Sequence, residues 1–353
     1  MATICVLNAG SSTLKYAVYE TAPTLGRVAG GTIEGGSLDR VPLPDDVAAF
    51  GHRVVHGGPH LSQPVAIDPE TFAAIEAVSP LAPLHNPPAL AVIRALRDRF
   101  PDTMQVACFD TGFHHGHPAV ADRFAIPDAL YQEGVRRYGF HGLSYEYIAG
   151  ALETVAPAIA KGRVVVAHLG SGASMCGLVG GRSVDSSMGF TALDGLPMGT
   201  RSGSLDAGVI LWLQQTKGWS VDRVEHFLYH DCGLKGLSGL SNDMRVLLAS
   251  DASLARLAVD YFVYHVARTA GALAASTGGL DAMVFTAGIG EHSPEIRSRV
   301  LRRLSWLGFE VDDTANAAGG PLLTASGSRL PAYVIPTDEE LVIARHTAAL
   351  FRG

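Results

Sequence analysis

Short apolar runs separated by turn residues recur along this chain, and their spacing predicts an α/β fold. We expect strands where apolar and β-branched residues cluster between turns, at 4–7, 15–19, 50–56, 106–109, 282–285 and 332–335. We expect helices where the apolar spacing is helical, at 69–78, 90–100, 144–155, 205–216, 221–229, 252–276, 294–307 and 339–350. The stretch from residue 20 to about residue 46 and the proline-rich PLAPLHNPPAL are expected to be loops.

One pattern occurs twice. VLNAGSSTLKYAVYE (6–20) is an apolar strand, a turn of small residues and a second strand, and VVVAHLGSGASMCGLVGG (164–181) repeats it. The repetition predicts two lobes built on one plan. The first turn is no Walker A loop, but its amides and side chains can cradle a phosphate. An ordinary polar hairpin is the alternative for this segment alone. Its candidate ligands are Asn8, Ser11, Ser12 and Lys15.

Two further glycine-rich segments extend this interpretation. The second hairpin turn, His168 to Gly172, would let two turns grip a polyphosphate, one from each lobe. A third turn, Gly288 to Glu291, follows an apolar strand and precedes a helix that begins at Pro294. We interpret it as a seat for a nucleotide base and ribose, although a G-x-G after a strand is common.

Two arginines and nearby polar residues are candidates for anion chemistry. Arg53 lies in a predicted strand and Arg201 in a loop between glycines, where each needs an anionic partner: a substrate or an internal salt bridge. Asp110 ends a buried strand, so it either holds a metal or proton or caps a turn. His141 is either a core histidine or a donor of a hydrogen bond to a developing phosphoryl charge, and His85 is a second candidate for that donor.

Composition narrows the class of protein. The 353 residues are 47% hydrophobic and 17% charged, which favours a large core and two domains. A net charge of -7 without a polybasic run argues against nucleic-acid and membrane partners. The four cysteines are dispersed and indicate reduced thiols of a cytosolic protein. No signal-peptide pattern is present, and we disfavour zinc binding by the histidines at 114, 115 and 117.

A series of motifs then identifies a family. They are, in order, NAGSSTLK, GHRVVHGG, PLHNPP, FDTGFH, YGFHGLS, HLGSG, SMGFTALDGLPMGTRSG, LSNDMR, FTAGIGEHSPEIR and IPTDEEL. Together they cover the chain from end to end, and the chain resembles the acetate kinases of the acetate and propionate kinase family. The resemblance implies the duplicated ribonuclease-H-like fold of the actin, Hsp70 and sugar kinase group, with an active-site cleft between its lobes. Residues 1–111 with 340–353 would form the first lobe, and 112–339 the second, nucleotide-binding lobe.

The resemblance also implies an activity. ATP would phosphorylate acetate reversibly to give acetyl phosphate and ADP, with Mg²⁺ (or Mn²⁺) as the metal, in a cytoplasmic homodimer. A propionate or broader short-chain acyl kinase is the first alternative, and a nucleotide-binding protein without catalysis is the second. A sugar kinase is disfavoured, because an arginine and apolar side chains offer few partners for a ring of hydroxyls.

Site residues follow from the same resemblance. The catalytic candidates are Asp110, His141 and Arg201. The substrate-binding candidates are Arg53, His85, Val55, Leu84 and Phe140. The nucleotide-binding candidates are Ser11, Ser12, Lys15, His168, Leu169, Gly170, Ser171, Gly172, Asp243, Met244, Arg245, Gly288, Ile289, Gly290, Glu291 and His292. The metal ligands would be Asn8 and Glu339. Because a carboxylate is already a nucleophile, we expect Asp110 to orient metal or substrate instead of abstracting a proton.

The chain departs from the family pattern at several positions. Ser171, Asp338 and His292 each stand where asparagine is usual, and Ala192 replaces a proline that helps close the acyl pocket. The smaller Ala192 would leave room for one more methylene, which is the reason for keeping propionate as an alternative. The section between Leu7 and Arg53 is also shorter than in typical members.

Overall fold

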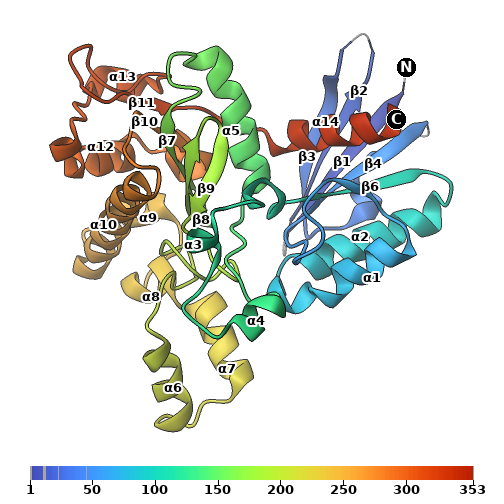
Figure 1. Cartoon of the computed structure of the whole chain (residues 1–353), viewed down its shortest axis with the longest axis horizontal. Coiled ribbons are helices and arrows are strands. Elements are labelled where there is room, and N and C mark those ends of the chain that lie inside the picture. Colours follow the sequence, from blue (N-terminus) through green and yellow to red (C-terminus); the bar gives the residue numbers. More distant parts are fainter. Residues whose placement is uncertain (1, 11–12, 23, 45, 353) are drawn as a thin grey trace. The chain divides into compact units, whose positions relative to one another are not determined.

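The computed structural model describes residues 2–10, 13–22, 24–44 and 46–352. The chain divides into two compact units, each with a mixed sheet and helices packed against it (Figure 1), so the predicted α/β class is confirmed. Unit 1 comprises Met1–His115, Ile126–Tyr147 and Asp338–Gly353. Unit 2 comprises Gly116–Ala125 and Ile148–Thr337.

The sheet of unit 1 combines a hairpin meander with parallel strands. In spatial order its strands are β3 (Gly26–Glu34), β2 (Thr13–Glu20), β1 (Thr3–Ala9), β4 (Val47–Val54), β6 (Met104–Phe109) and β5 (Val65–Ala66). β1, β2 and β3 pair antiparallel, whereas β1, β4 and β6 run parallel. The carboxyl ends of β1, β4 and β6 therefore lie at one edge of the sheet.

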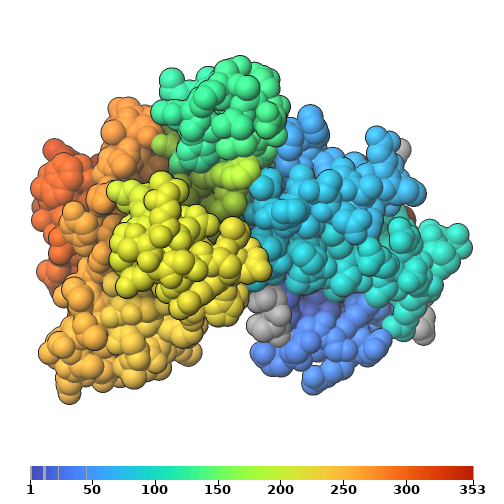
Figure 2. Space-filling view, turned by 90° about the horizontal axis from the view of Figure 1, so that it is seen from below, coloured from blue at the N-terminus to red at the C-terminus, as the bar shows by residue number. Residues whose placement is uncertain are grey.

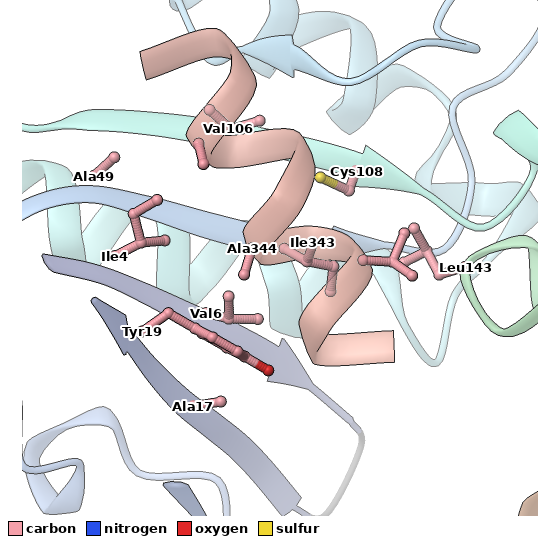
Figure 3. Close-up of a cluster of buried hydrophobic side chains, with 12 residues drawn as sticks. Ile4, Val6, Ala17, Tyr19, Ala49, Val106, Cys108, Leu143, Ile343 and Ala344 are labelled. Carbon is pink, nitrogen blue, oxygen red and sulfur yellow. The ribbon is translucent and has the colours of Figure 1, made fainter. Parts of the chain in front are cut away.

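Helices cover both faces of this sheet. The helices of unit 1 are α1 (Pro69–Ala77), α2 (Asn86–Arg99), α4 (Asp128–Gln132), α14 (Glu339–Arg352) and the first part of α5 (Gly142–Val155), with the short turns η1 (Leu38–Arg40), η2 (Ser79–Leu81) and η3 (Gly112–His114). α2 and α14 pack directly on the sheet. In β1, Ile4 and Val6 pack in the cluster that contains α14 (Figure 3), and Cys5 and Leu7 pack on the other face with residues of α2. Burial on both faces explains why β1 is a continuous apolar run.

A glycine allows α14 to approach the sheet closely. A Cβ on Gly51 in β4 would collide with Oγ1 of Thr347 and lie 2.7 Å from Cγ2 of Ile343, both in α14. This close approach holds the first residue of α14, Glu339, near the carboxyl edge of the sheet.

Unit 2 repeats the plan. Its strands in spatial order are β11 (Ala332–Val334), β10 (Ala282–Thr286), β7 (Arg163–Leu169), β8 (Ala173–Val179) and β9 (Arg182–Ser186). β7, β8 and β9 form an antiparallel meander, and β7, β10 and β11 run parallel. When the edge strand β5 of unit 1 is left out and the strands of each sheet are numbered along the chain, both sheets have the spatial order third, second, first, fourth, fifth. The duplicated plan predicted from the two hairpins is confirmed.

The helices of unit 2 surround this sheet and extend from it. They are α3 (Ala119–Asp122), the last part of α5, α6 (Ala207–Gln215), α7 (Val221–His226), α8 (Gly233–Ser238), α9 (Met244–Leu248), α10 (Ser253–Ser276), α11 (Ala287–His292), α12 (Pro294–Arg303) and α13 (Asp313–Ala318), with the π-helix η4 (Phe227–Asp231) and the turn η5 (Ser305–Leu307). α10 packs over β7 and β8. The segment with α6 and α7, yellow in Figure 2, lies on the viewed face of unit 2. Within the described residues, the structure contains no helix long and apolar enough to span a membrane.

Three expectations about local structure were wrong. The expected loop between 20 and 46 contains β3, whose glycine-rich and mostly exposed sequence GRVAGGTIE has little strand propensity and is held by pairing with β2. α2 begins at Asn86 instead of residue 90, because prolines are tolerated in the first turn of a helix. The expected turn at Gly288 is the helix α11, entered through Ala287 at a φ of 64°.

Candidate functional site

In unit 1, Arg53 is hydrogen-bonded to the buried carboxylate of Asp110. β4 carries Arg53, and Asp110 directly follows β6. Arg53 Nε donates to Oδ1 and Oδ2 of Asp110 at 3.2 and 3.1 Å, and Nη2 donates to Oδ2 at 2.5 Å. The Asp110 side chain is 1% exposed, whereas 15% of the Arg53 side chain is exposed. This fork geometry fixes the guanidinium, while part of the Arg53 side chain stays exposed.

Two more oxygen-bearing side chains reach the same guanidinium. Arg53 Nη1 donates to Asn8 Oδ1 at 3.2 Å, and Arg53 Nε lies 3.7 Å from Glu339 Oε2. Burial alone would lower the pKa of Arg53, but Asp110 and Glu339 more than offset that effect, and the net pKa is raised. With Asp110 and Glu339 ionised, two negative charges and one positive charge leave this cluster at a net charge of -1. The cluster can therefore accept a cation.

Sheet geometry explains why these residues meet. Asn8 lies near the end of β1 and Arg53 near the end of β4, and Asp110 follows the end of β6; these strands run parallel. In open α/β sheets, the carboxyl edge of parallel strands is where ligands bind. Glu339 joins the cluster as the first residue of α14.

The β1–β2 hairpin adds a cation beside this cluster. Lys15 lies directly opposite Asn8 in the antiparallel pairing, so the two side chains share one face of the sheet, and Lys15 is exposed. Ser11 and Ser12, also predicted to contact the nucleotide, lie outside the described residues.

The segment around His141 anchors Asp110. Asp110 N donates to Val54 O at 3.0 Å, and Gly142 N donates to Asp110 O at 2.9 Å. A Cβ on Gly142 would collide with Asp110 O, so only glycine fits there. His141 has a φ of 58°, unusual for a residue with a side chain. Such strain persists only where the surroundings enforce it, and it places the His141 amide so that the Asp110 carboxylate accepts its hydrogen bond.

The protonation state of Asp110 is set by opposing effects. Burial raises the pKa of Asp110, and the charge and hydrogen bonds of Arg53 lower it, with a net result of about 6. At neutral pH the carboxylate is therefore ionised in most molecules and holds Arg53 in place. It can be protonated in mildly acidic solution.

Three of the sequence motifs are joined by a buried network around His56. Its backbone N donates to Asn86 Oδ1 at 3.1 Å, and Asn86 Nδ2 donates to His56 O at 3.0 Å. Gly57 N donates to Thr111 Oγ1 at 3.2 Å. This network links GHRVVHGG, PLHNPP and FDTGFH. The sequence interpretation did not assign Asn86 or Thr111, because each acts through a backbone group distant in the sequence.

The residues predicted to bind the acyl group lie next to this network. Val55 and Phe140 are buried, and the Phe140 ring makes an edge contact with His56 at 5.4 Å between centroids. Leu84 and His85 are half-buried and immediately precede Asn86. The predicted acyl-binding residues therefore lie on segments that the network ties together.

The clustered histidines have separate partners. His114 is buried in unit 1 and its Nε2 lies 2.9 Å from Phe140 O, whereas Nε2 of His117, in unit 2, lies 2.6 Å from Ser183 Oγ. Among the described residues, no three His, Cys, Asp or Glu side chains are grouped as metal ligands.

In unit 2, the β7–β8 turn is packed between two other loops. His168 is buried at the end of β7, opposite Ser174 in β8 and Thr286 in β10. Ser171 O accepts a hydrogen bond from Gly199 N at 2.9 Å, and the Ser171 side chain is exposed. A Cβ on Gly199 would lie 3.2 Å from Ser171 Oγ and 3.4 Å from Asn242 Cβ. The backbone of Ser171 thus holds the neighbouring loop, so the serine in place of asparagine preserves this contact.

The other predicted nucleotide segments begin beside this turn. Ala287, which opens α11, would lie 3.8 Å from a Cβ on Gly170, and Gly288 and His292 on the same helix are exposed. Asp243 caps α9 by accepting from Arg245 N at 2.9 Å, and its carboxylate pairs with the exposed Arg245 guanidinium at 2.6 Å. Unit 2 therefore groups the glycine turn, the start of α11 and, through Asn242, the start of α9. The members of these segments are His168, Leu169, Gly170, Ser171, Gly172, Asp243, Met244, Arg245, Gly288, Ile289, Gly290, Glu291 and His292.

Glu291 already has an internal role. Its Oε1 accepts from Ala287 N at 2.8 Å and from Thr337 N at 3.1 Å. The carboxylate closes the first turn of α11 and ties it to the segment that follows β11.

Arg201 is held by its own loop. Its Nη1 donates to Ala192 O at 2.8 Å, and its backbone O accepts from Met198 N at 3.0 Å. Position 192, where the chain departs from the family pattern, is thus in direct contact with the predicted transition-state arginine, but through a backbone oxygen that any residue would supply.

Two further polar residues have clear structural roles. Asp338 Oδ1 accepts from Leu341 N at 2.9 Å, so the carboxylate that replaces the usual asparagine caps α14. Arg297 is 1% exposed and was not singled out from the sequence. It donates to Gly290 O and Glu291 O at 3.0 and 2.7 Å, and to Oδ1 and O of Asn316 at 2.8 and 2.6 Å.

The duplicated strand order places the chain in the fold class of the sugar kinase, Hsp70 and actin group. The match to a family model is more specific. The model described as the Acetokinase family matches residues 38–345, and the chain belongs to this family.

Individual relatives agree with that assignment. The chain is 54% identical over 389 aligned residues to a protein of Nitrobacter hamburgensis named acetate kinase, covering 99% of this chain and 96% of the relative. Among solved structures, a propionate kinase from Francisella tularensis is similar with a TM-score of 0.88 and 36% identity, covering 99% of this chain and all of that one. An acetate kinase from Porphyromonas gingivalis gives a TM-score of 0.88 at 32% identity, with the same coverage.

Proposed function

We propose that this chain transfers the γ-phosphoryl group of ATP reversibly to acetate, giving acetyl phosphate and ADP. The observation that carries the proposal is the Arg53 cluster, a fixed guanidinium on a partly exposed side chain at the carboxyl edge of the parallel strands, in a chain that belongs to the acetokinase family. Both the acceptor and the donor of this reaction are anions, so positive charge and fixed orientation are what the protein must provide.

In this proposal, Arg53 binds the acetate carboxylate. Its guanidinium has the planar fork that matches a carboxylate, and Asp110 holds it in one orientation. Asp110 acts on Arg53, not on a substrate proton, because acetate is already the nucleophile. Val55, Leu84 and Phe140 would surround the methyl group, and His85 would contact the substrate. His141, with its strained backbone beside Asp110, would donate a hydrogen bond to the transferring phosphoryl group.

The nucleotide would bind unit 2. The β7–β8 turn His168–Gly172, the α9 segment Asp243–Arg245 and the α11 segment Gly288–His292 would supply backbone amides and side chains to it. Lys15, Ser11 and Ser12 would contact its phosphates, and Arg201 would stabilise the negative charge of the transition state.

The oxygen atoms of the Arg53 cluster also fit a magnesium ion. Asn8 and Glu339 offer an amide and a carboxylate oxygen, the hard donors that Mg²⁺ prefers, and the cluster carries a net negative charge. We propose that these residues hold the ion, with Asp110 orienting its surroundings. A bound Mg²⁺ would neutralise charge on the phosphates. We also propose a cytoplasmic homodimer, for which family membership is the support.

Acyl-chain specificity is the direct test. We expect kcat/KM to be higher for acetate than for propionate or butyrate, measured with ATP and Mg²⁺ by acyl phosphate formation. A preference for propionate would favour the second candidate, a propionate kinase, which Ala192 and the similar Francisella tularensis structure support. In that case Ala192→Pro should shift the ratio of kcat/KM back toward acetate, by about 10-fold or more if the proline closes the pocket by one methylene. Absence of acyl phosphate with any of the three acids would contradict the proposal.

A further inference from the structure

The loop that carries Arg201 is bonded to the start of α8. Leu234 N donates to Met198 O at 2.9 Å, Lys235 N to Gly199 O at 3.0 Å, and Cys232 N to Thr200 O at 3.1 Å. These amides belong to the N-terminal part of α8 and the residue before it, and their usual partners within a helix are missing. Three consecutive carbonyl groups of the loop, those of Met198, Gly199 and Thr200, supply these partners. The loop backbone therefore runs along the start of α8.

The side chain of Thr200 adds a second attachment. Its Oγ1 donates to Tyr229 O at 2.7 Å, in η4, just before α8. On its other side, the loop is bonded to the β7–β8 turn through Gly199 N and Ser171 O at 2.9 Å. Arg201 therefore lies in a loop that is fixed between the predicted phosphate turn and the η4–α8 segment.

Gly233 is the closest point of this contact. It is buried, with a φ of 62°. A Cβ at this position would collide with Met198 O and lie 2.7 Å from Arg201 O and 3.0 Å from Arg201 N. These are backbone atoms of the loop, so a side chain at 233 would push the backbone of Met198 and Arg201 away from the start of α8.

We propose that Gly233 is a positioning residue for Arg201: the bare backbone at the start of α8 sets where the Arg201 guanidinium stands during phosphoryl transfer. This inference rests on the proposed function, in which Arg201 stabilises transition-state charge. It assigns a role to DCGLKG, a segment without any candidate residue in the sequence interpretation.

The chain contains a matched control in the same helix. Gly239 ends α8 and also has a φ of 62°, but no atom lies within 4 Å of a Cβ built there. Alanine at 233 or 239 therefore meets the same backbone preference, and the two variants differ in whether the new methyl group displaces the Arg201 loop.

The experiment compares Gly233→Ala with Gly239→Ala by steady-state kinetics and thermal unfolding. We expect kcat to fall by about 100-fold in Gly233→Ala, as for a displaced catalytic group, while the KM for ATP changes little. Gly239→Ala should retain the kcat of the parent protein. Equal kcat values for the two variants, or a loss of kcat in both that follows their loss of stability, would overturn the inference.

A double-mutant cycle with Arg201→Ala gives a readout that a purely structural role would not produce. If Gly233 acts through Arg201, Gly233→Ala should cause no further loss of kcat once Arg201 is alanine. Additive losses would show that Gly233 acts elsewhere and would contradict the inference. If Arg201→Ala alone leaves kcat unchanged, the proposed role of Arg201 is wrong; if Arg201→Ala lowers kcat and Gly233→Ala does not, only the positioning role is wrong.

A milder variant keeps the test available if Gly233→Ala does not fold. Thr200→Val removes the hydroxyl that bonds to Tyr229 O and preserves the shape of the side chain. We expect a smaller fall in kcat, again absent in the Arg201→Ala background. A parental kcat in Thr200→Val, whose side chain cannot donate to Tyr229 O, would count against positioning of Arg201 from this side of the loop.

Discussion

Arg53 and Arg297 are both largely buried, but their partners differ. Arg53 is bound by the carboxylate of Asp110, lies 3.7 Å from that of Glu339, and retains 15% exposure of its side chain. Arg297 is 1% exposed and donates to carbonyl oxygens of Gly290, Glu291 and Asn316 and to the amide oxygen of Asn316. The first arrangement holds a positive charge at the carboxyl edge of the sheet on a partly exposed side chain. The second provides hydrogen-bond donors for carbonyl groups at the C-terminal end of α11.

The comparison limits what the burial of an arginine implies. We expected an arginine in apolar surroundings to need an anionic partner. Arg297 meets this need with neutral acceptors, because the last carbonyl groups of α11 lack partners within the helix and carry the negative end of its dipole. Burial lowers the pKa of Arg297, and the hydrogen bonds to these carbonyl groups stabilise its charge. A buried arginine is therefore a substrate-binding candidate only where it keeps an exposed surface.

The largest effect expected from this difference is on catalysis. Arg53→Ala should lower kcat/KM for the carboxylate substrate by about 10²–10³-fold, because it removes a fixed charge and its hydrogen bonds. Arg53→Lys keeps the charge but loses the fork and should be intermediate. Steady-state kinetics in both directions would measure the effect, and calorimetry should show nearly unchanged ATP binding. Unchanged turnover in Arg53→Ala would remove the basis of the proposed role.

For Arg297, the expected effect is on stability. Arg297→Met leaves several buried oxygen atoms without donors and should lower the free energy of unfolding by about 3 kcal/mol. Arg299→Met, in the same helix α12, replaces an exposed arginine paired with Glu295 and Asp260 and should change little. Denaturant unfolding of both variants tests the difference. Because Gly290 and Glu291 belong to the predicted nucleotide segment, we also expect a raised KM for ATP in Arg297→Met. If Arg297→Met instead lowered kcat selectively, Arg297 and Arg53 would not differ in role as proposed.

The sequence marks Arg53 and Asp110 separately, as an arginine in a strand pattern and a carboxylate after a buried strand, while Asn8 and Glu339 follow from the family resemblance alone. Parallel pairing of β4 and β6 is what brings Arg53 and Asp110 to the same edge of the sheet. The hairpins are predictable, since a turn of small residues between two strand patterns specifies its own pairing. β3 escapes prediction because its exposed, glycine-rich sequence forms a strand only through β2.

Side-chain contacts to distant backbone groups leave no local pattern. Asn86 binds the backbone of His56, 30 residues away, and nothing in PLHNPP indicates which backbone it binds. Gly233 is one glycine among 40, and only the approach of the Arg201 loop distinguishes it from Gly239. These contacts depend on how the elements pack, so they become visible in the structure alone.

The smallest expected effect concerns the negative charge of Asp110, a partner that Arg53 has and Arg297 lacks. Because burial raises the pKa of Asp110 to about 6 against an ordinary value of 3.8, the carboxylate is protonated as the pH falls through 6. Arg53 then loses its ion pair with Asp110 and keeps only the more distant carboxylate of Glu339, at 3.7 Å. We expect kcat/KM to fall reversibly below pH 6, by about tenfold for each pH unit. A pH profile that stays flat down to pH 5 would contradict this role for Asp110.

Unfolding has to be separated from this loss of activity. A raised pKa in the folded state means that Asp110 binds its proton more tightly when folded, so this group alone makes the fold more stable as pH falls from 6 toward 4. His52 acts in the opposite direction: burial lowers its pKa from 6.5 to about 4, so its contribution to stability is present above 6.5 and is lost as pH falls toward 4. His52→Gln should reduce the loss of stability in acid and leave the fall in kcat/KM in place. If His52→Gln instead abolished the activity loss, acid inactivation would reflect unfolding at His52 and not protonation of Asp110.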